Sequence, residues 1–241
     1  MSGYLAIVPA FNEAGCIAQT VGEIREHAAD FDVLVVDDGS ADATAALALA
    51  AGARVVSLPF NVGIGGAMQC GYLYARDHGY TVAVQVDGDG QHDPRDIPRL
   101  LAALAADPDI EMVTGSRFLE DGGYRSSRMR LVGIRVFAAL MSLITRQRVT
   151  DPTSGFRMSA RRGIELFARD YPPDYPEVEA ILLLHSHSLR MKEVSVAMRP
   201  RTSGRSTIGR AIPVYYMFKV LFAVLVGLLR ARPDLEPSEL R

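Results

Sequence analysis

The most informative segment of this 241-residue chain is Val82-Ala83-Val84-Gln85-Val86-Asp87-Gly88-Asp89-Gly90-Gln91-His92-Asp93. An apolar, β-branched run leads directly into two aspartates that are separated by one glycine. Such a run is typical of a buried strand in a mostly parallel sheet. Ligands of open α/β sheets bind at the carboxyl ends of the strands. The segment therefore predicts a strand whose carboxyl end carries a binding site.

Asp87 and Asp89 are candidate metal ligands at this site. If the strand geometry continues for two more residues, both side chains point to the same side. Two hard oxygen donors on one side suit a Mg²⁺ or Mn²⁺ ion that carries phosphates, and Gln91 adds a neutral oxygen. Because Gly88 and Gly90 have no side chain, we expect a bulky ligand to reach the backbone there. The alternative is that these residues form only a turn.

The composition is that of a folded and nearly neutral protein. Hydrophobic residues make up 49% of the chain and the formal net charge is −2, which argues against disorder and against overall nucleic-acid binding. Cys16 and Cys70 have no metal-ligand spacing, so we expect free core thiols in a reducing compartment. The amino-terminal residues lead directly into a strand without a charged and then apolar leader, so a cytosolic location is expected.

Positive charge is concentrated in two segments of the chain. Residues 125–162 contain nine arginines and a single acid, Asp151, and residues 199–210 contain four arginines and no acid. Clusters of one sign attract ligands of the other sign. We therefore expect anionic partners at both segments.

Strand and helix patterns alternate along the first half of the chain. We expect strands at residues 4–8, 32–36, 54–58 and 111–115, in addition to the strand that leads to the two aspartates. We expect helices at residues 13–29, 42–51 and 93–106, the last of them begun by Asp93 as the N-cap before Pro94. A further helix is expected to follow the glycine-rich turn at residues 61–67 and to run to about residue 78. This alternation predicts a parallel-type α/β sheet.

Two other turns between these elements carry candidate binding residues. Asp37 and Asp38 end the second strand, where they can accept hydrogen bonds from a nucleobase or a ribose, or alternatively act as helix N-caps. The glycine-rich turn at residues 61–67 loosely resembles a dinucleotide-binding loop. It follows the third strand, however, and has no acidic residue at the expected offset. Close packing between strand and helix is the better interpretation of this turn.

Residues 128–147 form a strongly apolar helical pattern. Arg128, Arg135 and Ser142 recur every seven residues along one side of this helix. A core helix seldom carries arginines so regularly, whereas a helix lying on anionic lipid does. The pattern favours an interfacial helix.

Residues 211–229 form a second apolar pattern, in which Lys219 is the only charged residue. Nineteen helical residues are about 28 Å long, which is barely enough to span a membrane. A lysine at the centre costs about 2.5–3.5 kcal/mol on insertion scales. We therefore expect a helix that lies on the membrane or docks against a partner. The predicted organisation is a catalytic domain at residues 1–206, this docking helix at residues 207–230 and a polar tail at residues 231–241.

Several short motifs stand in the order that is typical of one enzyme family. The motifs are Ile7-Val8-Pro9-Ala10-Phe11-Asn12-Glu13, Val35-Val36-Asp37-Asp38-Gly39-Ser40, Asp87-Gly88-Asp89-Gly90-Gln91-His92, Gly115-Ser116-Arg117, Asp151-Pro152-Thr153-Ser154-Gly155-Phe156-Arg157 and Arg201-Thr202-Ser203-Gly204-Arg205-Ser206. With these motifs, over about residues 4–207, the chain resembles a family 2 glycosyltransferase of the GT-A fold. Within that family it is most similar to polyprenyl-phosphate sugar synthases such as dolichol-phosphate mannose synthase. The resemblance implies a Rossmann-like α/β fold, with a mostly parallel sheet flanked by helices and with membrane-associated C-terminal helices.

The resemblance also implies a role for each matching residue. The residues implied around the nucleotide sugar are Pro9, Phe11, Glu13, Val36, Asp38, Asp87, Gly88, Arg117 and Arg201. The implied ligands of Mg²⁺ or Mn²⁺ are Asp87, Asp89 and Gln91. Phosphate contacts of the acceptor would come from Arg125, Arg128, Arg130 and Arg201. Asp89, Arg117 and Asp151 form the implied catalytic group, with Asp151 as an orienting or charge-tuning residue. One position departs from the pattern, because Thr207 stands where the synthases usually have a lysine.

The activity implied by the resemblance is inverting transfer of a sugar from a nucleotide diphosphate to a polyprenyl phosphate. It would take place at the cytoplasmic face of the cell membrane, with the protein peripheral or anchored by its C-terminus. A small multispanning membrane protein or a second copy of the chain would suit the C-terminal helix as a docking partner. No nucleic-acid partner is expected.

Three other functions stay open. The first is transfer to a sugar hydroxyl in polysaccharide assembly, with Glu177 or Glu179 as the base; carboxylates in a first helical turn also simply complement the macrodipole. The second is a nucleotidyltransferase, although its glycine loop normally follows the first strand, where residues 9–13 stand. The third is a non-catalytic, lipid-docked scaffold, against which the intact metal residues argue.

Overall fold

The protein is described by a computed structural model that covers residues 3–119, 128–173 and 176–199. The strands are β1 (Tyr4–Ala10), β2 (Phe31–Asp37), β3 (Arg54–Ser57), β4 (Val82–Gln85), β5 (Ile110–Ser116), β6 (Arg157–Ala160) and β7 (Arg190–Ser195). The helices are α1 (Ile17–His27), α2 (Thr44–Ala50), α3 (Gly63–Asp77), the short 3-10 helix η1 (Pro94–Asp96), α4 (Ile97–Ala105), α5 (Arg128–Thr145), α6 (Arg161–Arg169) and α7 (Pro176–Ser186).

The strands of the described residues form one sheet in the order β3-β2-β1-β4-β6-β5-β7. Neighbours from β3 to β4 are parallel, and β7 is parallel to β5. Only β6 in this sheet runs against its neighbours, β4 and β5. The expected mostly parallel sheet is therefore confirmed. The reversal has a consequence for the site, because the amino end of β6 meets the carboxyl ends of β4 and β5.

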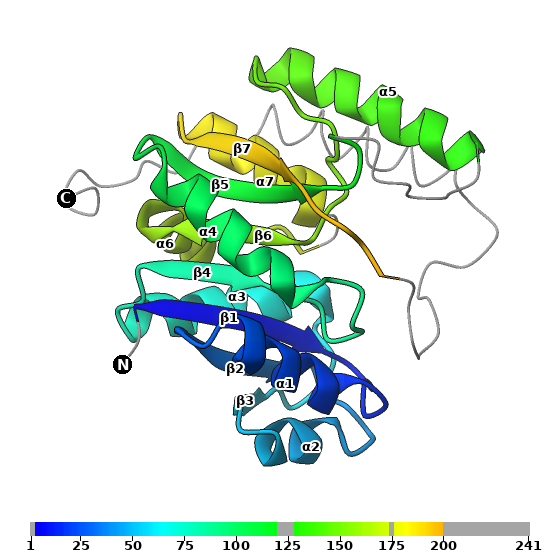
Figure 1. Cartoon of the computed structure of the whole chain (residues 1–241), viewed down its shortest axis with the longest axis vertical. Coiled ribbons are helices and arrows are strands. Elements are labelled where there is room, and N and C mark those ends of the chain that lie inside the picture. Colours follow the sequence, from blue (N-terminus) through cyan, green and yellow to red (C-terminus); the bar gives the residue numbers. More distant parts are fainter. Residues whose placement is uncertain (1–2, 120–127, 174–175, 200–241) are drawn as a thin grey trace.

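Helices cover both faces of the sheet (Figure 1). One face packs against α1, α2 and α4 through apolar side chains such as Val21, Ile24 and Leu100. The other face packs against α3, α5, α6 and α7, with Met68 and Phe167 among the buried residues. Inward and outward side chains alternate along a strand, so each strand supplies both layers. The sheet is thus buried on both sides, as expected for parallel strands.

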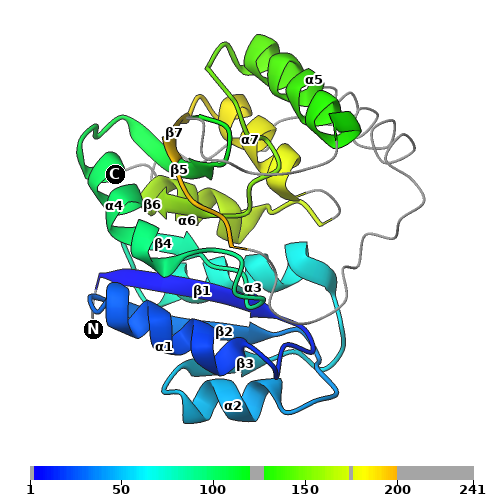
Figure 2. The same cartoon turned by 45° about the vertical axis from the view of Figure 1, so that its right-hand side comes forward.

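The two ends of the sheet differ in what lies beyond them. In both views α2 lies beside β3 at one end, and α5 lies beyond β7 at the other (Figures 1 and 2). Helix α5 packs inward through Phe137 and Met141. It leaves Val132, Val136 and Leu143 exposed. Of the described helices, none is long and apolar enough to cross a membrane.

Several predicted elements are confirmed with shifted bounds. Helix α1 begins at Ile17 and not at Glu13, because residues 14–16 form a turn in which the Cys16 and Ile17 N–H groups donate to the Glu13 carbonyl. Helix α5 lies close to the predicted range of residues 128–147, and α7 carries Glu177 and Glu179 in its first turn, as expected. Strands β6 and β7 and helix α6 were not predicted. Both cysteines are free as expected, but Cys70 is only partly buried.

Some predictions fall on residues that the structure does not describe. Residues 200–241 include the predicted domain boundary, the apolar C-terminal helix and the polar tail. Residues 120–127 include Arg125, and residues 200–241 include Arg201. The side chains of Arg128 and Arg130 also lie outside the described part of the chain. The roles and elements expected for these residues stay predictions.

Candidate active site

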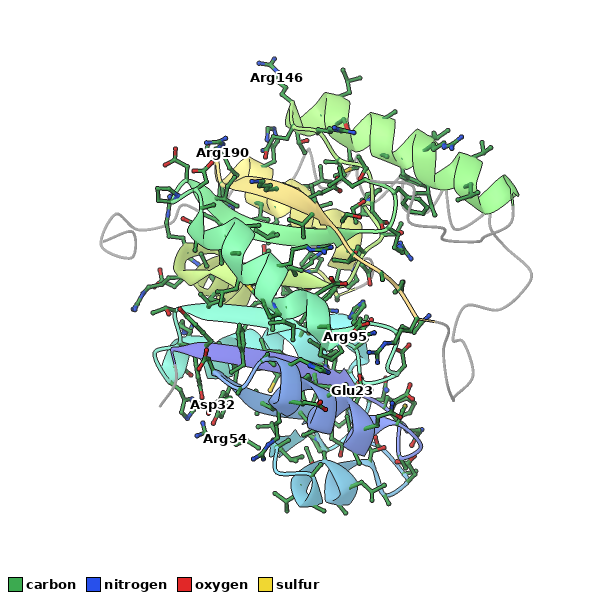
Figure 3. All side chains as sticks on the ribbon, viewed as in Figure 1. Glu23, Asp32, Arg54, Arg95, Arg146 and Arg190 are labelled. Carbon is green, nitrogen blue, oxygen red and sulfur yellow. The ribbon has the colours of Figure 1, made fainter. Side chains whose placement is uncertain are left out.

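The polar residues singled out in the sequence gather at the carboxyl edge of the sheet. This edge lies where the arrow of β1 points in Figure 1. Arg95, beyond β4, lies on this side in Figure 3. Asp32 and Arg54, which approach to 3.8 Å, mark the opposite edge. The predicted location of the site at the strand ends is therefore consistent with the fold.

Asp87 and Asp89 stand on a turn and not on an extended strand. Strand β4 ends at Gln85, and the chain reverses through Gly90, whose φ is +74°. The expectation that strand geometry carries the two side chains to one side was therefore wrong. Asp89 Oδ1 accepts a hydrogen bond from the Gln91 N–H at 3.0 Å. Asp87 Oδ1 accepts one from Gln85 Nε2 at 3.0 Å, and its side chain is 33% exposed.

Gly88 packs closely against the end of β1. Its N–H donates to the Pro9 carbonyl at 3.2 Å, and an added Cβ would lie 3.1 Å from that oxygen. Its own carbonyl accepts from Cys16 Sγ at 3.2 Å and from Thr20 Oγ1 at 3.4 Å. The peptide between the two aspartates is thus held against β1 and α1.

The loops after β1 and β2 are tied to each other. Asn12 has a φ of +56°, in the left-handed region that asparagine tolerates better than most residues. Its N–H donates to Ser40 Oγ at 2.9 Å, and its Oδ1 accepts from the Ala41 N–H at 2.9 Å. The Glu13 N–H donates to Thr44 Oγ1 at 2.9 Å. These bonds position the loop that contains Phe11 and Glu13.

The residues predicted around the nucleotide differ in the solvent exposure of their side chains. Phe11 is 46% exposed, whereas the side chains of Pro9 and Val36 are buried. Glu13 is buried, and its Oε2 accepts from Cys16 Sγ at 3.2 Å. Asp38 uses its two carboxylate oxygens to accept the N–H groups of residues 62 and 63, at 2.7 and 2.9 Å. Asp38 therefore accepts the first N–H groups of α3 from a neighbouring loop, although the N-cap residue of that helix is Val62 and the expected N-cap role of Asp38 is not seen.

Arg117 and Asp151 form a buried ion pair. Asp151 Oδ2 accepts from Arg117 Nε at 2.6 Å, and Oδ1 accepts from Nη2 at 2.7 Å. Thr153 Oγ1 accepts a further hydrogen bond from Nη2 at 2.6 Å. Asp151 is 0% exposed and Arg117 is 7% exposed. Asp151 thus orients Arg117 and pairs with its guanidinium charge.

Glu193 of β7 accepts hydrogen bonds from the loop that carries Asp151. Its carboxylate accepts the N–H groups of Thr150 and Asp151 at 2.8 and 3.0 Å, and the Thr150 hydroxyl at 2.7 Å. Burial raises the pKa of Glu193, although these hydrogen bonds oppose the rise. The loop that carries Asp151 is therefore fixed by a strand that the sequence analysis missed.

Arg157 is a buried residue whose role was not foreseen. It is 1% exposed and stands at the amino end of β6. Its guanidinium donates to the carbonyls of Ser154, Pro176 and Glu177, which joins the loop before β6 to the start of α7. Burial raises the pKa of Glu177; the charge of Arg157 opposes this rise and that of Asp87 adds to it. Glu177 is thus electrostatically coupled to the Asp87 turn.

Arg199 holds the last described residues beside the same turn. Its N–H donates to the Gln91 carbonyl at 3.0 Å, and its guanidinium donates to Asp93 at 2.8 Å and to Glu23 of α1. Asp93 also accepts the Arg95 N–H at 3.1 Å, which confirms it as an N-cap. Burial disfavours the ionised carboxyl, but hydrogen bonds from Arg95 and the charge of Arg199 lower the pKa of Asp93.

The described part of the chain contains no group of three or more His, Cys, Asp or Glu side chains that could hold a metal ion by themselves. The candidate donors are Asp87, Asp89 and the amide oxygen of Gln91. They are hard oxygen donors, and Mg²⁺ is commonly bound by only one or two carboxylates while substrate phosphates complete its shell. The donor set therefore fits a metal that arrives with a nucleotide diphosphate.

Comparison with known proteins gives concordant results. The model of the family described as glycosyl transferase family 2 matches residues 5–167. An undecaprenyl-phosphate mannosyltransferase of Micrococcus luteus is 30% identical over 221 residues, which cover 86% of this chain and 88% of that protein. A polyprenol monophosphomannose synthase of Mycolicibacterium smegmatis is 30% identical over 226 residues, which cover 90% of this chain and 84% of that protein.

Among solved structures, the chain resembles glucosyl-3-phosphoglycerate synthase from Mycobacterium tuberculosis, crystallised with Mn²⁺, uridine diphosphate and glucosyl-3-phosphoglycerate. The TM-score is 0.67 at 24% sequence identity, and the match covers 96% of this chain and 81% of that one. At this level of identity the likeness shows that the fold is shared.

Proposed function

Because the chain belongs to glycosyltransferase family 2, we propose that it transfers a sugar from a nucleotide diphosphate to a polyprenyl phosphate. The observation that carries this proposal is the pair of relatives named for sugar transfer to polyprenyl or undecaprenyl phosphate, each matched over most of the chain. The proposed reaction inverts the configuration at the anomeric carbon.

The proposed donor site is built around Asp87, Asp89 and Gln91, which would hold Mg²⁺ or Mn²⁺. The metal would neutralise the diphosphate as it leaves the sugar. Phe11 is exposed just after β1 and would contact the nucleotide. The other residues proposed to contact the nucleotide sugar are Pro9, Glu13, Val36, Asp38, Asp87, Gly88, Arg117 and Arg201. The solved neighbour crystallised with Mn²⁺ and uridine diphosphate supports a metal-bound nucleotide.

The acceptor is proposed to need little help from a base. A phosphate monoester is already anionic at neutral pH, so its oxygen attacks without first losing a proton. Positioning and charge neutralisation then carry the catalysis. We assign the acceptor phosphate to Arg125, Arg128, Arg130 and Arg201. In this scheme Asp151 holds Arg117 in place and compensates its charge, as the 2.6 and 2.7 Å contacts suggest.

A direct assay tests this proposal. The full-length protein is incubated with Mn²⁺, a panel of radiolabelled nucleotide sugars and undecaprenyl phosphate in detergent. We expect label to enter the organic phase in a form that mild acid releases, because a sugar linked through a phosphate is acid-labile. No label in the organic phase with any donor, from protein that is folded and binds nucleotide, would contradict a polyprenyl phosphate acceptor.

A sugar-hydroxyl acceptor is the second candidate, and the raised pKa of Glu177 favours it. A hydroxyl must lose a proton during attack, and a carboxylate with a raised pKa is a better base. Glu177 and Glu179 lie in the first turn of α7. The same assay with oligosaccharide acceptors separates the two functions, since a hydroxyl-transferring enzyme would label the aqueous product instead.

We further propose that the enzyme works at the cytoplasmic membrane face and that α5 lies in the lipid interface. Val132, Val136 and Leu143 are exposed on this helix. Arg135 and Arg146 are exposed beside them, and Arg146 points away from the body of the protein in Figure 3. Apolar and basic side chains on one exposed helix suit an anionic bilayer. The helix predicted at residues 207–230 would provide a second attachment. It would lie on the membrane, or it would dock against a small multispanning membrane protein or a second copy of the chain.

The triple substitution Val132→Ser, Val136→Ser and Leu143→Ser is expected to weaken binding to anionic vesicles by about tenfold or more. Each buried aliphatic side chain contributes about 1.5–3 kcal/mol, and a loss of about 1.4 kcal/mol is tenfold. The measurement is co-sedimentation of the full chain with vesicles of phosphatidylglycerol and phosphatidylcholine. Leu49→Ser, at an equally exposed leucine on α2, is the matched control. Unchanged partitioning of the triple variant would contradict an interfacial α5.

A further inference from the structure

His92 is buried directly beneath the Asp87 turn and has no assigned role in the proposed reaction. It is 3% exposed. Its Nδ1 accepts a hydrogen bond from the Asp87 N–H at 3.0 Å. Because the backbone amide can only donate, Nδ1 must be the unprotonated nitrogen of the neutral ring. The proton of the neutral imidazole is therefore on Nε2.

His92 Nε2 faces the carboxylate of Asp87. The distance from Nε2 to Asp87 Oδ2 is 3.6 Å, slightly longer than a hydrogen bond. Nε2 is also one of the few buried side-chain polar atoms in the described part of the chain that have no hydrogen-bond partner. A buried donor without a hydrogen-bond partner lowers the stability of the folded state, and such donors are rare in native proteins. The position of Nε2 therefore calls for an explanation. A small rotation of the Asp87 carboxylate would complete the bond.

Gln85 approaches the same carboxylate from the other side. Its Nε2 donates to Asp87 Oδ1 at 3.0 Å, so the two oxygens of Asp87 face two different N–H donors. The ring of His92 is itself held by stacking on Phe156, at 4.9 Å between centroids and an interplanar angle of 12°. The donors are therefore fixed by buried packing and do not depend on solvent.

Gly155 lies against the side chains of Gln85, Asp87 and His92. A Cβ added there would lie 3.1 Å from Gln85 Nε2, 3.4 Å from Asp87 Oδ2 and 3.6 Å from His92 Cε1. The first distance is tighter than an ordinary contact. The loop before β6 thus passes so close to Gln85 that a side chain at position 155 would displace the amide.

We propose that His92 is a positioning residue that, together with Gln85, fixes the orientation of the Asp87 carboxylate and the path of its backbone. The inference rests on the proposed function, in which Asp87 helps to bind a divalent cation. Oriented ligand carboxylates bind metals better because the free protein does not have to order them on binding, and loss of such supporting partners typically weakens metal binding about 10- to 100-fold.

The test measures Mn²⁺ binding directly, by the electron paramagnetic resonance signal of free Mn²⁺, on the full-length protein without substrate. His92→Phe keeps a ring that can stack on Phe156 and removes both nitrogens. Gln85→Leu is nearly isosteric and removes the other donor. We expect both variants to bind Mn²⁺ about 10- to 100-fold more weakly than the wild type, with melting temperatures close to it.

His78→Phe is the matched control. His78 is also a stacked and hydrogen-bonded histidine, 3.8 Å from the ring of Tyr74 and with Nδ1 2.9 Å from the Tyr74 carbonyl, but it caps the far end of α3. Its replacement should leave Mn²⁺ binding unchanged. A long-range ¹H–¹⁵N spectrum of the metal-free wild type adds a readout independent of metal, and should show His92 protonated on Nε2.

The outcomes separate this inference from the proposed function. If the wild type binds Mn²⁺ and His92→Phe binds it equally well, the positioning role is overturned and the metal site stands. A His92 ring protonated on Nδ1 would also overturn it, whatever the variants do. If the wild type binds no Mn²⁺ either alone or with uridine diphosphate, while the spectrum shows the Nε2 tautomer, the metal site is overturned and the geometry of His92 stands.

Discussion

Asp89→Ala is expected to abolish sugar transfer and to leave the fold intact. Asp89 stands on the turn after β4 and would be a metal ligand, so its loss would weaken binding of the cation that neutralises the developing negative charge of the leaving diphosphate. Removal of one group of this kind costs about 10²–10³ in rate, and loss of the metal itself would cost more. Turnover with the radiolabelled donor is the measurement, and circular dichroism shows whether the fold persists.

Asp77→Ala serves as the control for Asp89→Ala. Asp77 is a carboxylate at the end of α3; its side chain is 58% exposed and is paired with its neighbour Arg76. Its substitution should leave turnover unchanged. Excess chelator should stop the wild-type enzyme, and added Mn²⁺ should restore it. Full activity of the wild type in chelator would refute the metal-dependent mechanism.

Asp151→Asn is expected to lower the free energy of unfolding by about 3–5 kcal/mol. The substitution leaves the guanidinium of Arg117 buried without its counter-charge, and breaking a buried pair by changing one partner is strongly destabilising. The shape of the side chain is kept, so the effect reports charge and not packing. Urea unfolding followed by circular dichroism measures the loss, provided that the slope of the transition stays constant.

Asp109→Asn removes one partner of an exposed pair and is the matched control. Asp109 and Arg190 approach to 3.4 Å, but their side chains are 75% and 56% exposed, so solvent screens the interaction. The expected change is below about 1 kcal/mol. If Asp151→Asn cost no more than this control, the pair would be solvated.

Elements whose signals are local could be predicted from the amino-acid sequence alone. Alternating patterns predicted the strands and helices of the first half, because strand and helix periodicity depends on neighbouring residues. The N-cap at Asp93 was predictable for the same reason, since a cap and its partner N–H are two residues apart. The location of the site followed from a general rule, that the ends of parallel strands share one edge of a sheet.

Local signals failed where an element is short or a strand boundary is not marked. Strand β6 has four residues, and α6 has nine, so neither shows a long periodic pattern. The apolar residue Val86 extends the strand pattern past Gln85, although the strand ends there. The antiparallel direction of β6 also could not be predicted from the sequence. Its antiparallel pairing follows from the whole sheet, and it carries Asp151 and Gly155 to the carboxyl ends of β4 and β5.

The contacts of the candidate site residues depend on the folded structure and could not be predicted from the sequence. Arg117 could be identified as a basic residue at a strand end, but its counter-ion lies 34 positions away. Glu193 supports the backbone at Thr150 from 43 positions away. Such contacts depend on where the folded sheet and loops bring distant segments together, and burial then sets how strongly the charges interact. The chain of residues supplies the charges and hydrogen-bond donors; their pairing is a property of the packed fold.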